Sequence, residues 1–300
     1  MLTNNDLAEI PPLSSDRVDF ERVHETRNII LEKAFACYQR TTNTQLQSEF
    51  EAFADQNASW LDDYALFRAL KNAHNGEAWP AWERSLVQRE PAALAHAGAE
   101  LHNQIEAQKF YQFLFFKQWF DLKEYCGERG IRIIGDVPIF VAHDSADAWS
   151  NPDQFKLDED GNPIVVAGVP PDYFSATGQF WGNPLYNWDR MLGDGFRWWI
   201  ERVRTALQTV DIARIDHFRG FAACWEIPVG DMTAEHGRWV ESPGRELFTA
   251  IRQALGELPI IAEDLGVITA DVEKLRDEFG FPGMRVLQFA FSSDATNSGT

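Results

Sequence analysis

The hydrophobic and polar positions divide the chain into an N-terminal part with helical periodicity and a longer part in which helices alternate with apolar runs. In the first part, apolar side chains recur at intervals of three and four residues, which is typical of amphipathic helices. Asp16 or Asp19 is a candidate N-cap for the first helix, and Asn75-Gly76 is a stop signal for the third. The pattern predicts helices over residues 17–38, 45–56, 60–74 and 92–128.

Apolar, β-branched runs follow Gly130, and a helical pattern precedes each of them. Buried parallel strands have this composition, so the alternation predicts an α/β fold with a parallel sheet. Residues 141–195 differ: they are rich in Pro, Gly, Asn and Asp, and such a long irregular segment in a compact domain is usually functional. Within it, Asp160-Gly161 predicts a hairpin turn. The predicted strands lie in residues 131–140, 210–218, 259–266 and 284–291.

The charge balance restricts the partners of the protein. Aspartate and glutamate number 46 against 27 lysines and arginines, which gives a net charge of −19. Such a surface repels phosphate backbones and anionic lipids, so no nucleic acid and no membrane partner is expected. The negative charge does not disfavour neutral, hydroxyl-rich ligands. The 11 tryptophans offer flat faces on which sugar rings stack, although most aromatic side chains are expected in the core.

Cysteine usage and hydropathy indicate a cytoplasmic protein. Three cysteines without a CxxC pair exclude a disulfide framework and a cysteine-based zinc site, and they fit a reducing compartment. The most apolar stretch, residues 110–120, is too short to cross a bilayer, and the N-terminus lacks the pattern of a signal peptide. Asp158, Asp160 and Asn162 resemble a calcium loop only superficially, because the glycine is at the wrong position, so no metal site is predicted.

Charged side chains interrupt three of the predicted strands near their C-terminal ends. An unpaired charge is costly in a buried strand, and active sites of parallel α/β folds assemble at this end. Three successive strands with the same interruption therefore indicate a site. The charged residues are Asp136 on the first strand, Arg214, Asp216 and His217 on the second, and Glu263 and Asp264 on the third.

Two of these carboxylates suit different chemical roles. Residues two apart in a strand point the same way, so Arg214 lies beside Asp216 and favours its ionised form, as a nucleophile requires. Glu263 follows an apolar run that favours its neutral form, which suits a proton donor. Glycoside-cleaving enzymes use a pair of carboxyl groups of which one is ionised and the other protonated. A structural salt bridge between Arg214 and Asp216 is the alternative.

Several long motifs of the chain resemble the 4-α-glucanotransferase (amylomaltase) family, glycoside hydrolase family seventy-seven. The resemblance implies a (β/α)8 barrel and a retaining double displacement on α-1,4-glucans, with maltodextrin as donor, a sugar acceptor, and no metal or organic cofactor. It predicts a mainly helical subdomain over residues 1–108 and the central part of the barrel over residues 109–300. The motifs lie in residues 133–152, 166–191, 213–228, 260–269 and 281–291.

The same motifs imply roles for single residues. By position in RIDHFRG and AEDLG, Asp216 resembles the nucleophile and Glu263 the general acid/base, with Arg214 and His217 contacting the nucleophile and the sugar. The stretch GVPPDYFSATGQFWGNP is similar to the family's loop over bound glucan. Its implied ligand contacts are Asp172, Gln179 and Trp181, the last as a stacking platform. For Asp136, substrate binding and a structural role are equally open.

The chain departs from the family in its third catalytic carboxylate, an aspartate that follows a histidine. No such pair follows Phe291, and Asp294 lacks the neighbours of the motif, so the chain is expected to be incomplete at both ends. The leading hypothesis is a glucan-transferring enzyme. The alternatives are a glucan-binding fragment without turnover, a hydrolase of the same clan, and a structural or interaction protein, which leaves the charged strand ends unexplained.

Overall fold

The computed structural model describes residues 2–288 except 4, 5, 7, 9, 12, 173, 174 and 267. The chain forms two compact units. The first comprises Met1–Ala78 and Arg89–Trp119, and the second comprises Trp79–Gln88 and Phe120–Thr300. The boundary predicted at residue 108 lies inside a helix, α6 (His102–Gly127), and that division stays a prediction. No helix of the described residues is both long and apolar enough to cross a membrane.

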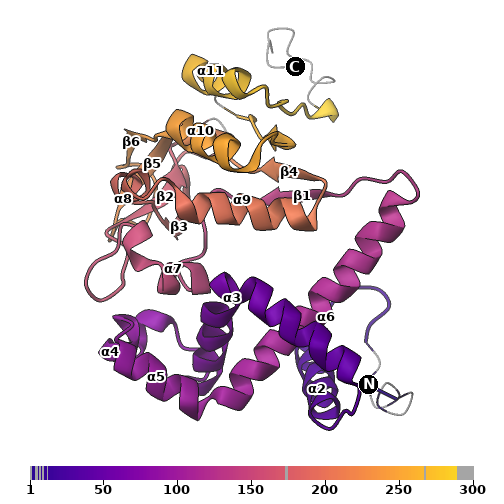
Figure 1. Cartoon of the computed structure of the whole chain (residues 1–300). Coiled ribbons are helices and arrows are strands. Elements are labelled where there is room, and N and C mark those ends of the chain that lie inside the picture. The colour runs from indigo at the N-terminus through magenta and orange to yellow at the C-terminus, as the bar shows by residue number, and fades with distance from the viewer. Residues whose placement is uncertain are drawn as a thin grey trace. The chain divides into compact units, whose positions relative to one another are not determined.

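Helices build the first unit (Figure 1). Asp19 caps the first of them, since its carboxylate accepts a hydrogen bond of 3.2 Å from the backbone N–H of Arg22. A cluster of aromatic side chains forms the core between three helices: Phe35, Phe50, Phe110 and Phe113. These three helices are α2 (Phe20–Gln39), α3 (Thr44–Ala73) and the first part of α6, and α5 (Pro91–Glu100) precedes α6 in the same unit.

Three helix predictions in this unit are wrong in their boundaries. The segments 45–56 and 60–74 form one helix, α3, because Asn57 between them bonds within the helix, its amide donating to the carbonyl of Phe53 at 2.8 Å. The single helix predicted over 92–128 is two, α5 and α6. Leu101 separates them with a backbone φ of −99°.

A parallel sheet forms the centre of the second unit. Its strands are β1 (Ile134–Val137), β4 (Ile212–Ile215) and β7 (Ile260–Ala262), in the order β1-β4-β7. Figure 1 shows α9 (Arg197–Thr209) and α10 (Gly244–Leu255) packed side by side in this unit, and α11 (Ala270–Phe279) follows β7. The α/β fold class and three of the predicted strands are confirmed.

The fourth predicted strand, residues 284–291, is wrong for its described part. Residues 284–286 have no regular structure and 287–288 form a short 3-10 turn. The backbone N–H of Met284 donates to the carboxylate of Asp264 at 2.7 Å instead of to a neighbouring strand. Residues 289–291 of that prediction, and Asp294, lie outside the described residues.

The long segment 141–195 is not the irregular loop that its composition indicates. Two of its stretches are strands of a second, antiparallel sheet, in the order β3-β2-β5-β6. Two short helices also lie in it, α7 (Ala146–Ser150) and α8 (Trp188–Gly193). The sheet consists of β2 (Val165–Val169), β3 (Gln179–Pro184), β5 (Ala223–Pro228) and β6 (Arg238–Glu241).

The hairpin predicted at Asp160-Gly161 is confirmed. The N–H of Asp158 donates to the carbonyl of Asn162 at 2.8 Å, and the Asp158 carboxylate accepts hydrogen bonds from the N–H groups of Asp160 and Asn162. The carbonyl of Gly161 lies 2.7 Å from His143 Nε2. The turn is therefore tied to the remainder of the second unit.

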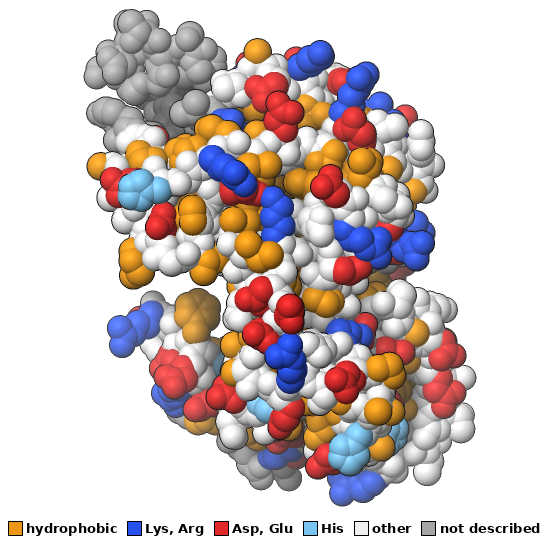
Figure 2. Space-filling model, turned by 90° about the vertical axis from the view of Figure 1, so that its left-hand side faces the viewer, with side chains coloured by type: hydrophobic (Ala, Val, Ile, Leu, Met, Phe, Trp, Pro, Cys, Tyr) orange, Lys and Arg blue, Asp and Glu red, His pale blue; other side chains and the backbone are white. Residues whose placement is uncertain are grey.

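About half of the aromatic side chains in the described part of the chain are buried in the core. Trp79, Trp149, Trp199, Phe218 and Phe248 are almost completely buried. On the surface, acidic and basic side chains alternate with scattered hydrophobic ones over the face drawn in Figure 2. Such a mixture is ordinary for a protein surface. Only the aromatic residues that remain exposed can serve as platforms for a ligand.

Gly161→Ala is expected to lower the free energy of unfolding by about 2–4 kcal/mol, measured by urea denaturation. Gly161 has φ of +81°, and an added Cβ would lie 2.3 Å from the buried indole of Trp79. Gly130→Ala is the matched control, because Gly130 has φ of +69° and no atom within 4 Å of the added Cβ. Gly130→Ala is expected to lower the free energy of unfolding by only about 1 kcal/mol, the cost of placing alanine in a left-handed backbone conformation. Equal losses in the two variants would contradict the steric argument.

Candidate active site

The C-terminal ends of β1 and β4 bring three charged side chains together. Asp136 pairs with Arg214 across the two strands in the sheet register. The Arg214 guanidinium donates to both neighbouring carboxylates: Nη1 lies 2.6 Å from Asp136 Oδ1, and Nη2 lies 2.9 Å from Asp216 Oδ1. The Asp216 side chain is 45% exposed, so a substrate can reach it. This places an accessible, ion-paired carboxylate at the strand ends, as predicted.

Glu263 follows β7 and is held by backbone groups of two segments. Its Oε2 accepts a hydrogen bond of 2.8 Å from the N–H of His217, and its Oε1 accepts one of 2.9 Å from the N–H of Leu265. Burial raises the pKa of Glu263, and the charge of Asp216 adds to this, against the opposing effect of the two N–H groups. The direction agrees with the prediction of a carboxyl group that favours its neutral form. Neither N–H donor could be inferred from residue types.

His217 connects the two carboxylates through its backbone. It has left-handed geometry, with φ of +52°, and this conformation directs its N–H to Glu263. Its ring packs edge-on against Trp181, with centroids 4.8 Å apart. Burial and the charge of Arg219 lower the pKa of the imidazole to about 4, so His217 is neutral at pH 7.

His217→Asn is expected to make the stability of the chain less sensitive to acid. The pKa of His217 is about 4 in the folded state against 6.5 for an ordinary histidine, so only the unfolded state takes up this proton between these values. Folding stability falls as pH decreases through that window, by up to about 3 kcal/mol for this group. Asparagine tolerates left-handed geometry and does not titrate. Urea denaturation at pH 7 and pH 4.5 measures the difference, and an equal pH dependence of both proteins would contradict it.

The predicted contact residues of strand β3 reach the same place in part. Trp181 is 37% exposed, and its indole N–H donates to the side-chain oxygen of Gln179 at 3.1 Å. Trp181 also lies beside Phe140, with ring centroids 6.3 Å apart. Asp172 lies in the turn before β3, where its carboxylate accepts a hydrogen bond of 2.8 Å from the N–H of Ser175.

Asp264 turns away from this site, although the sequence places it at the same strand end. Its side chain is 2% exposed and forms an ion pair with Arg276. It also lies 3.8 Å from Arg285 and accepts the N–H of Met284. Met284 in turn contacts Arg214, with 3.2 Å between its sulfur and Arg214 Nε. A lone methionine carries no sequence signal for such a contact, so this neighbour was not predicted.

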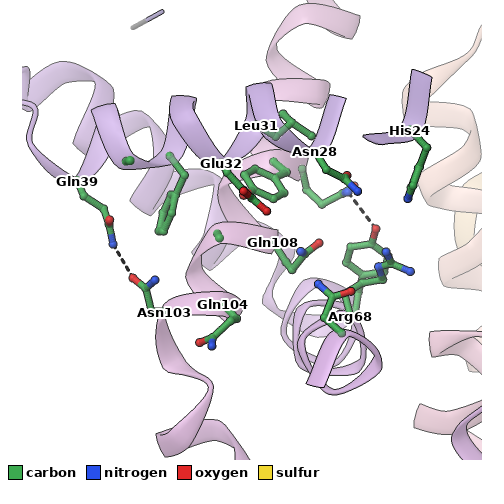
Figure 3. A pocket seen from close by; sticks show the side chains of 16 residues that line it. His24, Asn28, Leu31, Glu32, Gln39, Arg68, Asn103, Gln104 and Gln108 are labelled. Atoms are coloured by element: carbon green, nitrogen blue, oxygen red, sulfur yellow. Dashed lines mark hydrogen bonds between the residues drawn. The ribbon is translucent and has the colours of Figure 1, made fainter. Parts of the chain in front are cut away.

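A separate cavity of about 480 Å³ lies in the first unit, between α2, α3 and α6. Its lining is rich in side-chain amides and aromatic rings (Figure 3), and the Gln39 amide donates to Asn103 at 2.6 Å. The sequence predicted no chemistry in these helices. No group of three or more His, Cys, Asp and Glu side chains arranged to hold a metal ion occurs in the described part of the chain.

Comparison with known proteins places the chain in a family. A family model described as 4-alpha-glucanotransferase matches residues 2–299. The chain belongs to this family. The resemblance of the motifs is thereby confirmed for almost the whole sequence. The assignments of single residues in the family's reaction stay predictions.

Several relatives and solved structures within the family are similar to this chain. The 4-alpha-glucanotransferases of Synechocystis sp. and Thermus thermophilus are each 51% identical over 97% and 96% of this chain, and the match spans 58% of each relative. An amylomaltase from Streptococcus agalactiae, solved in complex with acarbose, superimposes with a TM-score of 0.93 at 40% identity, covering 99% of this chain and 60% of that one. The chain therefore spans somewhat more than half the length of these relatives.

Proposed function

We propose that the protein carrying this chain transfers α-1,4-glucan segments between maltodextrins by a retaining double displacement. One observation carries the proposal: an accessible Asp216, paired with Arg214, stands beside a Glu263 whose pKa is raised, in a member of the 4-alpha-glucanotransferase family. A retaining transfer requires an ionised nucleophile and a protonated acid. The raised pKa of Glu263 suits the acid, and the ion pair of Asp216 with Arg214 suits the nucleophile.

The chemistry assigns each carboxyl group two steps. Glu263 donates its proton to the glycosidic oxygen while Asp216 attacks the anomeric carbon, so that the bond to the leaving glucan breaks and a glucosyl ester forms. Glu263 then takes the proton of an acceptor hydroxyl, which attacks the same carbon and releases Asp216. Attack by a sugar hydroxyl gives transfer, and attack by water gives hydrolysis.

The remaining candidates bind substrate or orient these two groups. The exposed face of Trp181 stacks on a sugar ring, with Gln179 holding the indole, and Asp172 contacts the glucan from the turn before β3. Arg214 forms an ion pair with Asp216 and orients its carboxylate. We assign Asp136 to the orientation of Arg214, because its only described side-chain partner in this network is that guanidinium. His217 contacts the sugar and fixes Glu263 through its backbone.

We also propose that β1, β4 and β7 are three strands of a (β/α)8 barrel. Their parallel order supports this assignment, as do the helices α9 and α11, which precede β4 and follow β7 along the chain. The helical first unit would be an addition to the barrel. A maltodextrin donor and a sugar acceptor are the proposed partners, and the cytoplasmic location stays a prediction.

A chimera tests the proposal. In it, this chain replaces the matching 58% of the Synechocystis 4-alpha-glucanotransferase, which supplies the residues beyond the match. Incubation with maltotriose is expected to give glucose and longer maltodextrins. A glucan-binding fragment would instead bind maltodextrin, as measured by tryptophan fluorescence, without turnover in the chimera. A hydrolase would release new reducing ends in proportion to product. Either of these results contradicts transfer.

A further inference from the structure

Arg214 donates to three different partners, and only two of them are carboxylates. Nη1 binds Asp136 and Nη2 binds Asp216, while Nε points to the sulfur of Met284 at 3.2 Å. A guanidinium is planar, with its N–H donors in a fixed fork. Fixing the direction of Nε therefore fixes where both terminal nitrogens point. The partner of Nε therefore helps to set the orientation of the whole group, together with the two carboxylates.

The position of Met284 is determined from outside the site. Its backbone N–H donates to Asp264 Oδ1 at 2.7 Å, and Asp264 is buried and paired with Arg276 on α11. The preceding residue, Gly283, passes so close that an added Cβ would lie 2.3 Å from Asp264 Oδ2. One residue earlier, the carbonyl of Pro282 accepts the N–H of Ala262 on β7 at 2.9 Å. The segment that carries Met284 is thus fastened to both β7 and α11.

We infer that Met284 is a positioning residue for the Arg214–Asp216 pair, held in place by the buried Asp264. This inference rests on the proposed function, because Met284 would affect catalysis by orienting the Asp216 carboxylate toward the anomeric carbon of the sugar. Met284 itself acts only through Arg214. Asp264 stands one step further away and acts through the backbone of Met284.

A thioether suits this role because it is a weak and uncharged acceptor. It occupies Nε without competing for the positive charge that Asp136 and Asp216 share. A carboxylate at this position would draw the guanidinium away from Asp216, since charge-assisted hydrogen bonds are about twice as strong as neutral ones. A hydrocarbon side chain would leave a donor of a half-buried arginine without a protein partner. The sulfur avoids both problems.

Nuclear magnetic resonance of the 300-residue chain tests the contact directly. The chain has four methionines, so their labelled methyl groups give few signals. Arg214→Lys and Asp264→Asn are each expected to shift the Met284 methyl signal, while the signal of Met232, which is 90% exposed, stays in place. Met284→Leu is expected to shift the Arg214 Nε–H signal, and Met284→Gln, whose amide oxygen also accepts, is expected to retain a hydrogen-bonded Nε–H. Unmoved signals overturn the inference.

Kinetics of the chimera test the consequence. Met284→Leu keeps the volume of the side chain and is expected to lower kcat about tenfold with KM changed less than about twofold, since the aim of the nucleophile matters only in the chemical step. Met284→Gln is expected to recover most of the rate, and the control Met232→Leu to leave it unchanged. A Met284→Leu chimera with full kcat overturns the positioning role. A chimera with the natural sequence that leaves maltotriose unchanged contradicts the proposed function, while the resonance shifts still decide the contact.

Discussion

Asp216→Asn is expected to lower the rate of maltotriose conversion in the chimera by about 10⁴-fold or more, because the amide cannot form the glucosyl ester on which the transfer depends. The substitution keeps the size of the side chain, and the amide oxygen still accepts from Arg214. Binding of maltodextrin is expected to change little. Product analysis by chromatography measures the rate, and intrinsic fluorescence measures the binding.

The matched control for this variant is Asp189→Asn, which neutralises an exposed aspartate in the first turn of α8. It is expected to retain full activity. Substantial turnover by Asp216→Asn would assign the nucleophile to another residue. Loss of binding together with activity would instead indicate that the substitution disturbs the site as a whole.

Glu263→Gln is expected to lower the rate with maltotriose by about 10²–10⁴-fold, the contribution of a general acid. The loss should be much smaller with an α-glycosyl fluoride, since fluoride leaves without needing a proton. The same group is expected to set the alkaline limb of the pH profile. Burial raises the pKa of Glu263, so its carboxyl group stays protonated to a higher pH than that of an ordinary glutamate. Activity of the chimera with the natural sequence is therefore expected to fall as pH rises through this raised pKa.

Steady-state rates are measured from pH 4 to 9 with maltotriose and with the glycosyl fluoride. The comparison separates the effect of Glu263 on formation of the glucosyl ester from its effect on transfer to the acceptor. The variant is expected to lose the alkaline limb that Glu263 causes. An equal loss with maltotriose and with the fluoride would remove Glu263 from the role of acid. An unchanged alkaline limb in the variant would assign that titration to another group.

The parallel strands could be predicted from the sequence because they are continuous apolar runs. Ile215 in β4 and Ile260 in β7 are buried positions of such runs, whereas Ile134 in β1 is exposed. The antiparallel strands β2 and β3 could not be predicted in the same way. Gly168 and Gly182 interrupt their apolar pattern, and the second partner of β2, β5, lies far along the chain. Pairing over that distance leaves no local trace.

The charged residues of the candidate site were predictable for a related reason. A charge at the end of an apolar strand is an anomaly that residue types reveal, and Asp136, Arg214 and Asp216 are indeed in contact. Residue types do not reveal which way an end residue turns. The Glu263 side chain turns to the backbone of His217 in the candidate site, whereas the adjacent Asp264 side chain turns to Arg276. Only the fold distinguishes the two directions.

The strand that carries Trp181 has a thermodynamic consequence for ligand binding. A stacking ring on an irregular loop loses backbone and side-chain entropy when a sugar orders it. The backbone of β3 is already fixed by its pairing with β2, and Gln179 and His217 already restrict the indole. Most of the ordering cost at this ring is therefore met during folding, so the sugar contact proposed for Trp181 is expected to add to affinity with little entropic loss.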